Sequence, residues 1–419
     1  MTTAATTAAT TAAATAPTTA PTTEPTARPL RQIPICRVDL DDREQAAVCE
    51  VLQSGWLVQG RQVAAFEQAI AAECDVPHAI ATTSCTTALQ LVLAALDVGP
   101  GDEVIVPGFT WVATANAVLH AGATPVFCDI DLATFNLDPS RLESLVTERT
   151  VGIFAVDLFG AMAPLDAINA VAERRGLWVV EDAACALGSR ANGKAPGSAT
   201  TAACFSFHPR KSITTGEGGM VVTRDAALAD RCRVLRNHGA SVSDHARHGS
   251  KYGFLLSEFA EFGFNMRMTD LQGAIGAVQM EKLPRILQDR AWCAAFYEER
   301  LAALPMLRRP QPPAGTTHSW QSYVALFAPE SPTLETLPRL EQARNDVLTT
   351  LADRGVTTRQ GTHAPVRLTC YRERFDLPPE EFPNSWLADG LSLSLPLLPG
   401  QPADDLAYVV DELTDALAA

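Results

Sequence analysis

The chain has 419 residues, of which 47% are hydrophobic and 19% charged, enough for one large core or two smaller ones. Its formal net charge of -15 argues against non-specific binding to nucleic acid or to an anionic membrane. No apolar run reaches the roughly 18 residues of a membrane span, and the ten cysteines include no pair with the two-residue gap of a zinc or thioredoxin-type motif. We therefore expect a reduced, cytoplasmic protein with no metal site and no membrane or nucleic-acid partner.

The first 27 residues are almost entirely Thr, Ala and Pro, with neither the basic segment nor the apolar segment of a secretory signal. Such a composition cannot bury a core and predicts a disordered tail. We accordingly divide the chain into a tail over residues 1–29, a large domain over 30–280 and a smaller C-terminal domain over 281–419.

Beyond the tail, short apolar strands alternate with segments of helical periodicity. Helices are expected near residues 63–74, 89–96, 111–121, 142–146 and 165–172. Strands are expected near residues 79–81, 104–106, 125–129, 151–156, 177–182, 202–207 and 220–223. This alternation predicts an α/β fold with a mainly parallel sheet that is covered on both faces and binds ligands at the carboxyl ends of its strands.

The pattern loosens after about residue 279, and three prolines mark a break near residues 310–313. Helical spacing returns near residues 283–287, 337–352 and 406–417, with a strand expected near 356–358. These elements predict a smaller α+β domain.

Lys211 lies in an unusual local sequence, between a proline and a glycine-rich turn. The strand ending at Phe207 leads into a turn that holds Pro209 and Lys211, and the glycines at 216, 218 and 219 precede the next strand. An amine condenses with an aldehyde only when it is unprotonated, which partial removal from water favours. A solvated lysine in a hairpin is the alternative, and this segment alone does not separate the two.

Three further groups directly follow predicted strands, so we expect them at the same sheet edge as Lys211. A pyridoxal phosphate site needs a lysine, a carboxylate at the pyridine nitrogen, a flat side chain over the ring and donors at a helix N-terminus for the phosphate. Lys211, Asp182, Trp111 and Thr86 match these needs in turn. Taken singly, Asp182, Trp111 and Thr86 are better explained as a helix cap or a core position; their convergence with Lys211 predicts the cofactor site.

These residues resemble the pyridoxal-phosphate-dependent sugar aminotransferases of the DegT/DnrJ/EryC1/StrS family, from Ser54 to Pro396. The strongest motifs are Glu181-Asp182-Ala183-Ala184, Ser206-Phe207-His208-Pro209-Arg210-Lys211 with Gly216-Glu217-Gly218-Gly219, and Gly263-Phe264-Asn265-Met266-Arg267-Met268-Thr269-Asp270. The resemblance implies fold type I, the aspartate aminotransferase-like fold: a large domain with a mainly parallel, seven-stranded sheet and a smaller C-terminal α+β domain.

The resemblance also implies roles for single residues. Lys211 forms the Schiff base with the cofactor and shuttles the proton, Asp182 pairs with the pyridine nitrogen, and Trp111 stacks on the ring. Thr86 and Ser206 hold the phosphate.

Three more positions follow from the family pattern. Asn265 matches an asparagine that reaches the phosphate of the neighbouring subunit's cofactor, which implies a homodimer with shared active sites. Cys85 stands where the family mostly has glycine. Cys185 stands where histidine or glutamine contacts the ring hydroxyl, and because a thiol is a weak donor, that contact is expected to change. His363 is open between a substrate contact and a structural role, as is a polar loop around His245.

The implied reaction is a ping-pong transamination. An amino acid, expected to be L-glutamate, leaves its amine on the cofactor, and the amine passes to a keto group of a nucleotide-linked deoxysugar. A keto-cyclitol acceptor and a non-catalytic regulator of the same fold are the alternatives. A pyridoxamine-dependent dehydratase is disfavoured because such members carry histidine where this chain has Lys211. A nicotinamide enzyme is disfavoured because the early strands lack Gly-x-Gly-x-x-Gly.

Overall fold

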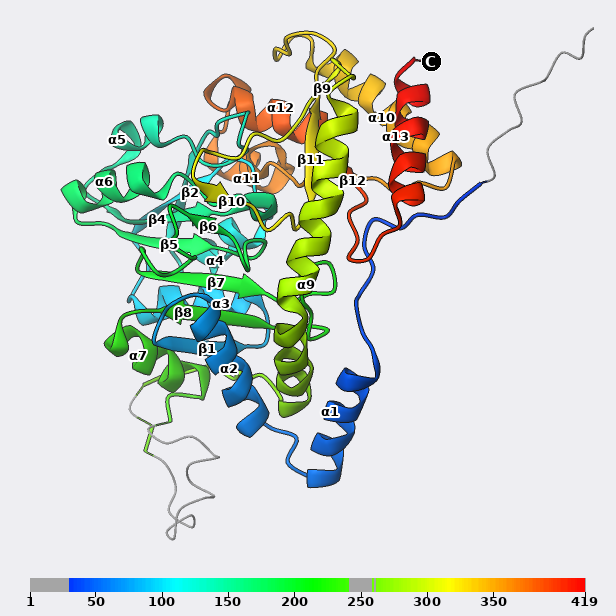
Figure 1. Ribbon diagram of the computed structural model, residues 1–419. Helices are drawn as coiled ribbons and strands as arrows, with labels where there is room; N and C mark the ends of the chain where they lie inside the picture. The colour runs from blue at the N-terminus through cyan, green and yellow to red at the C-terminus, as the bar shows by residue number, and fades with distance from the viewer. Residues whose placement is uncertain (1–29, 241–257, 260, 419) are drawn as a thin grey trace, which may run out of the picture.

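The computed structural model describes residues 30–240, 258–259 and 261–418 (Figure 1). The predicted tail over residues 1–29 and the polar loop around His245 lie outside these ranges, so both remain predictions.

A seven-stranded sheet forms the centre of the large part, as predicted, in the order β1-β8-β7-β5-β4-β2-β3. Only β8 is antiparallel to its neighbours; the other strands share one direction. Their carboxyl ends therefore meet at one edge, apart from β8. The strands are β1 (His78–Thr82), β2 (Glu103–Pro107), β3 (Thr124–Cys128), β4 (Thr150–Val156), β5 (Trp178–Asp182), β7 (Ala202–Ser206) and β8 (Gly219–Thr223).

Helices cover both faces of this sheet because each strand is apolar on both sides. In β1, for example, Ile80 packs into one hydrophobic cluster, whereas Ala79 and Ala81 pack into another. The first face carries α3 (Cys85–Ala95), α4 (Ala113–His120) and α7 (Ala226–Arg236). The second carries α2 (Arg61–Glu73), α5 (Leu142–Leu145), α6 (Leu165–Arg175) and the first half of α9 (Asp270–Leu301).

The C-terminal part is built on a three-stranded antiparallel sheet of order β12-β11-β9. Its elements are β9 (Leu307–Arg308), β11 (Tyr323–Phe327), α10 (Leu337–Asp353), α11 (Thr369–Phe375), α12 (Pro383–Leu391), β12 (Ser392–Leu395) and α13 (Ala403–Ala418). A two-stranded pair, β6 (Arg190–Ala191) with β10 (Thr316–Thr317), and the 3₁₀ turns η1 (Pro139–Arg141), η2 (Leu158–Gly160), η3 (Pro365–Arg367) and η4 (Pro379–Glu381) complete the described elements.

Two sequence expectations need comment. The strand expected near 356–358 is wrong: Val356 and Arg359 make only isolated bridges, to Ile33 and Ser394, because this segment is held between two other segments rather than in one ladder. The expected boundary between residues 280 and 281 falls inside α9, which runs as one helix from the large sheet to the C-terminal part (Figure 1). The division into domains therefore remains a prediction.

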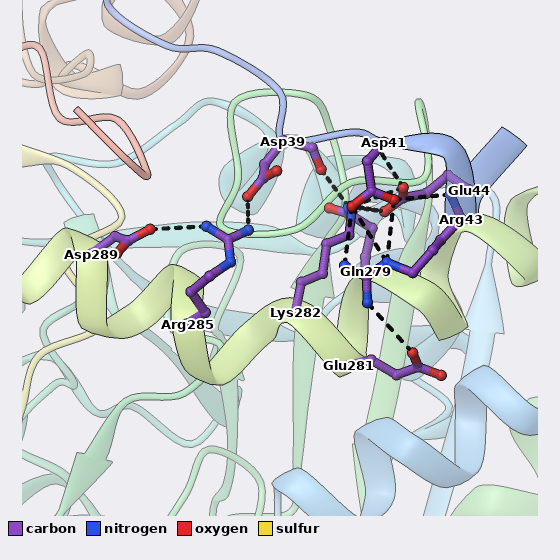
Figure 2. A network of polar contacts seen from close by, with 9 residues as sticks. All are labelled: Asp39, Asp41, Arg43, Glu44, Gln279, Glu281, Lys282, Arg285 and Asp289. Carbon is purple, nitrogen blue, oxygen red and sulfur yellow. Dashed lines mark hydrogen bonds and ion pairs between the residues drawn. The ribbon is translucent and has the colours of Figure 1, made fainter. Parts of the chain in front are cut away.

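The segment before α2 is fastened to α9 through a buried lysine (Figure 2). The Lys282 side chain is 0% exposed, and its Nζ lies 2.7 Å from Glu44 Oε1 and 3.0 Å from Asp41 Oδ2. Gln279 donates to the same Glu44 carboxylate at 2.6 Å. Glu44 belongs to α1 (Asp42–Ser54), whose N-cap is Asp41. The cluster therefore fixes the start of α1 against the middle of α9.

Within the described ranges, we find no helix with the length and apolar character needed to cross a bilayer. The same residues contain no group of three or more His, Cys, Asp or Glu side chains placed to hold a metal ion.

Candidate active site

A cavity of about 610 Å³ opens at the carboxyl edge of the large sheet, where the C-terminal part closes over it. Its floor comes from the ends of β1, β4, β5 and β7, and its far wall from residues 359–363. Of the predicted site residues, seven line this cavity: Cys85, Thr86, Trp111, Asp182, Cys185, Ser206 and Lys211. Asn265 is the predicted site residue that does not.

Lys211 is held in a tight turn after β7. Its amide donates to the His208 carbonyl at 2.8 Å. Gly219, the first residue of β8, lies so close to the start of α3 that a Cβ there would meet the Ser84 carbonyl carbon at 2.3 Å. Glycine is therefore required for close backbone approach. Lys211 Nζ contacts Cys185 Sγ at 3.1 Å, so the amine faces the cavity beside a thiol.

Asp182 ends β5 at the base of the cavity and is only 5% exposed. Its Oδ2 accepts from Thr114 Oγ1 at 2.6 Å, and its Oδ1 accepts from the Ala184 amide at 3.2 Å. Burial raises the pKa of Asp182, and these two donors oppose the rise. A cation placed against this carboxylate would favour its charged form. Sequence reasoning missed Thr114; its place in the first turn of α4, three residues after Trp111, was the available signal.

The N-terminus of α3 faces the same cavity. Ser84 is its N-cap, and a capping box joins Ser84 with Thr87. The cap uses the amide of Thr87, and the Ala88 amide bonds to the Ser84 carbonyl. Within the described part of the chain, this leaves the amides of Cys85 and Thr86 to the cavity, where the positive end of the helix dipole favours an anion.

The two unusual cysteines both line this cavity. Cys85 Sγ contacts the Cys204 carbonyl at 3.6 Å and Asp182 Oδ1 at 3.9 Å. Burial raises the pKa of Cys85 well above its ordinary value, so this thiol remains neutral. Cys185, whose Sγ lies beside Lys211, is the group nearest the amine.

A pair of buried acids next to Asp182 was missed by sequence reasoning. Asp157 follows β4, and its buried carboxyl interacts with that of Glu181. Asp157 Oδ1 accepts from the Ala163 amide at 2.8 Å, and Glu181 Oε1 accepts from Gly197 at 2.7 Å. Their other oxygens have no donor among the described residues. Burial and the neighbouring carboxyl raise the pKa of Asp157, so the pair retains a proton.

Trp111 stands at the cavity mouth and is 53% exposed. Its ring centroid lies 5.8 Å from that of His363, which also lines the cavity. The Thr110 amide donates to the His363 carbonyl at 3.0 Å, so the two parts of the fold are joined here. The structure therefore places His363 at the site, as a contact with substrate would require.

Asn265 lies outside its own chain's cavity. It is exposed and makes an isolated bridge with Asn237. The neighbouring Phe262 and Phe264 are also exposed, at 103% and 41%. This face is therefore accessible to another molecule.

These residues fit pyridoxal phosphate. A lysine amine, a buried carboxylate with two hydrogen-bond donors, a helix N-terminus and an exposed tryptophan surround one cavity. Each meets one chemical need of the cofactor.

Comparisons with known proteins agree. The model of the DegT/DnrJ/EryC1/StrS aminotransferase family matches residues 38–414. Spore coat polysaccharide biosynthesis protein SpsC of Bacillus subtilis (strain 168) is 39% identical over 369 residues, 88% of this chain and 92% of that protein. GDP-perosamine synthase of Caulobacter vibrioides is 44% identical over 276 residues, 66% of this chain and 71% of that protein. The crystal structure of S. venezuelae DesV is 32% identical, with a TM-score of 0.82 over 93% of this chain and 99% of that one.

Proposed function

Because the chain belongs to the DegT/DnrJ/EryC1/StrS family, and is a pyridoxal-phosphate-dependent sugar aminotransferase, we propose that it moves an amino group from L-glutamate to a keto group of a nucleotide-linked deoxysugar. The observation that carries the proposal is the meeting of Lys211 and Asp182 in one cavity with the N-terminus of α3. A reaction at an amino group needs the lysine and the aspartate, and an anionic cofactor needs the helix N-terminus.

When bound, pyridoxal phosphate supplies an electron sink for the carbon next to the reacting nitrogen. In the proposed roles, Lys211 would hold the cofactor through its amine and would then carry a proton between the α-carbon of the amino-acid donor and the cofactor. Asp182, positioned by Thr114, holds a proton at the ring nitrogen. Trp111 covers the ring and excludes water from that face.

The phosphate is proposed to bind at α3. Thr86 and Ser206 supply hydroxyl groups there, and the backbone amide of Cys85 needs no particular side chain to donate. We propose that Cys185 lies on the side of the ring that faces Lys211, because Cys185 Sγ is 3.1 Å from Lys211 Nζ.

The relative named GDP-perosamine synthase supports a nucleotide-linked sugar as acceptor, and no described feature of this chain favours a keto-cyclitol. We also propose a cytoplasmic location, which the ten free cysteines support.

We further propose a homodimer in which Asn265 serves the partner's site. The exposed Phe262 and Phe264 beside it support this, because apolar side chains gathered at the surface mark interaction sites. Light scattering should give twice the chain mass. Mixing Lys211→Ala with Asn265→Ala subunits should restore activity at one site in each mixed dimer; a monomer, or no restoration, would contradict shared sites.

The direct test of the function is a visible spectrum of the protein with pyridoxal phosphate, before and after L-glutamate. The yellow band should give way to that of the pyridoxamine form, and a nucleotide-linked keto-sugar should bring it back. A yellow protein that ignores glutamate would mean another donor. A protein that never takes up the cofactor would refute the function.

A further inference from the structure

Two arginines stand out because their charges are not balanced. Arg210 and Arg359 both line the active-site cavity, and both also line a small adjoining cavity of about 20 Å³. Arg210 is exposed and Arg359 is half-buried. Among the described residues, neither guanidinium group forms an ion pair, and the buried Nε atom of Arg359 has no hydrogen-bond partner. The lining of the small cavity contains no acidic residue.

Three more deeply buried arginines of this chain also have an Nε without a partner among the described residues, but each of them forms hydrogen bonds through Nη1. Arg236 donates to Glu67 at 2.7 Å, and Arg344 donates to the Ser392 carbonyl at 2.8 Å. Arg290, which also lines the small cavity, donates to the carbonyls of Trp320 and Gln321. Arg359 differs from them because no nitrogen of its guanidinium group has a hydrogen-bond partner among the described residues. Since a half-buried charge without a partner is costly, this difference points to a ligand.

The two arginines are held in place by their backbones. The Ser394 amide donates to the Arg359 carbonyl at 2.8 Å, which ties Arg359 to β12. Gln321 Nε2 donates to the Arg210 carbonyl at 2.7 Å. Burial lowers the pKa of Arg359, and the cation of Arg210 adds to this effect. An anion between them would relieve the repulsion between two like charges.

The position of the pair decides which anion it receives. Arg210 precedes Lys211 in the chain, and Arg359 lines the same cavity as Lys211 and Cys185. An α-amino acid carries its carboxylate on the carbon that bears the reacting nitrogen, so that carboxylate must lie near the lysine. A sugar nucleotide carries its diphosphate beyond the sugar ring, farther from the carbon that receives the amine.

We propose that Arg210 and Arg359 form the binding site for the carboxylate of the amino-acid donor. The proposal rests on the aminotransferase function stated above. Arg359 is the principal partner, because its planar group can bind a carboxylate through two parallel hydrogen bonds.

The test compares two ligands on the holoenzyme. Absorbance of the cofactor gives the L-glutamate concentration that half-saturates the first half-reaction, and calorimetry gives the affinity for GDP as a probe of the acceptor side. Arg359→Gln should raise the half-saturating glutamate concentration roughly 10- to 100-fold, because a charge-assisted hydrogen bond is lost. Arg359→Lys should lie between it and the wild type, since lysine keeps the charge without the paired donors. GDP affinity should stay unchanged.

Arg308→Gln, at an exposed position in β9, removes the same charge away from the cavity and should alter neither value. Thermal unfolding of each variant shows that it is folded. If GDP binding weakens while glutamate saturation stays as in the wild type, the pair serves the acceptor's diphosphate and the proposal is wrong. Unchanged values for both ligands would also overturn it. A wild-type protein that takes up no cofactor would instead refute the function itself.

Discussion

Two lysines of this chain, Lys211 and Lys282, are both drawn in from the surface, and their surroundings differ sharply. Lys282 is fully buried between two carboxylates, those of Glu44 and Asp41 (Figure 2). Lys211 faces a cavity, and its amine donates to the sulfur of Cys185. An amine enclosed by carboxylates is held as a structural cation, whereas one beside a thiol and an open cavity is free to react. The partners of a buried lysine therefore separate a structural role from a chemical one.

The largest expected effect separates the two lysines by activity. Lys211→Ala should reduce transamination by roughly 10⁴-fold or more, because the variant loses both the covalent anchor and the proton carrier. Its unfolding midpoint in urea should remain close to that of the wild type. Turnover assays and urea unfolding check both halves, and retained turnover would refute the role of Lys211.

Lys282→Ala should show the reverse pattern. Removing the cation leaves Glu44 as a buried, uncompensated charge, at a cost of about 3–5 kcal/mol in the free energy of unfolding. Arg285→Ala, on the same helix but half exposed, should cost about 1 kcal/mol or less. If both substitutions cost the same in urea unfolding, the buried cluster does not fasten α1 to α9.

Asp182→Asn tests the base of the cavity. The amide keeps the shape and can still accept from Thr114, but it carries no charge to hold a proton at the ring nitrogen. Turnover should fall roughly 10²- to 10³-fold, as for the loss of one preorganised electrostatic partner, while the cofactor remains bound by absorbance. Wild-type turnover would mean that another group serves the nitrogen.

The smallest expected effect is a difference in pH dependence between the two regions. Burial opposes the charged form of Glu44, but hydrogen bonds from Lys282, the Asp41 amide and Gln279 outweigh it and lower the pKa of Glu44. The contribution of Glu44 to the free energy of unfolding is present above its pKa in the unfolded chain, about 4.3. This contribution is lost as the pH falls through the pKa of Glu44 in the folded protein. Glu44→Gln should therefore lose less stability than the wild type between pH 5 and pH 3.

The pKa of Asp157 shifts in the opposite direction. Burial and the neighbouring Glu181 raise its pKa, so its contribution is present below the unfolded value of about 3.9 and declines as the pH rises through the folded pKa. Asp157→Asn removes this titration and gives Glu181 a donor. Its free energy of unfolding at pH 8 should exceed that of the wild type by about 1 kcal/mol. Urea unfolding from pH 3 to pH 9 checks both variants, and parallel pH profiles would contradict the assigned shifts.

Much of the large sheet could be predicted because its strands are short, apolar and separated by helices with clear periodicity. The expectations for residues 151–156 and 220–223 correspond to β4 and β8, and that for 63–74 to α2. The C-terminal part was harder. β11 and β12 were not anticipated, and the expected strand at 356–358 is replaced by single bridges, because these residues pair with partners far away in the chain.

The site divides in the same way. Lys211, Asp182, Trp111 and Thr86, which line one cavity, could be proposed from the sequence because each follows a strand or opens a helix, and both are local features of the sequence. Thr114, the Asp157–Glu181 pair and the Arg210–Arg359 pair were not, because their significance depends on what stands opposite them.

The sequence by itself determined the parallel sheet, the edge at which ligands bind, and the lysine and aspartate that this edge presents, since periodicity and strand ends are local properties. The tertiary structure decided which charges are paired. In the folded protein Lys282 contacts two carboxylates and Lys211 contacts a thiol, whereas Arg359 has no ion-pair partner among the described residues. Burial and electrostatic balance depend on contacts between distant segments, and no local pattern encodes them.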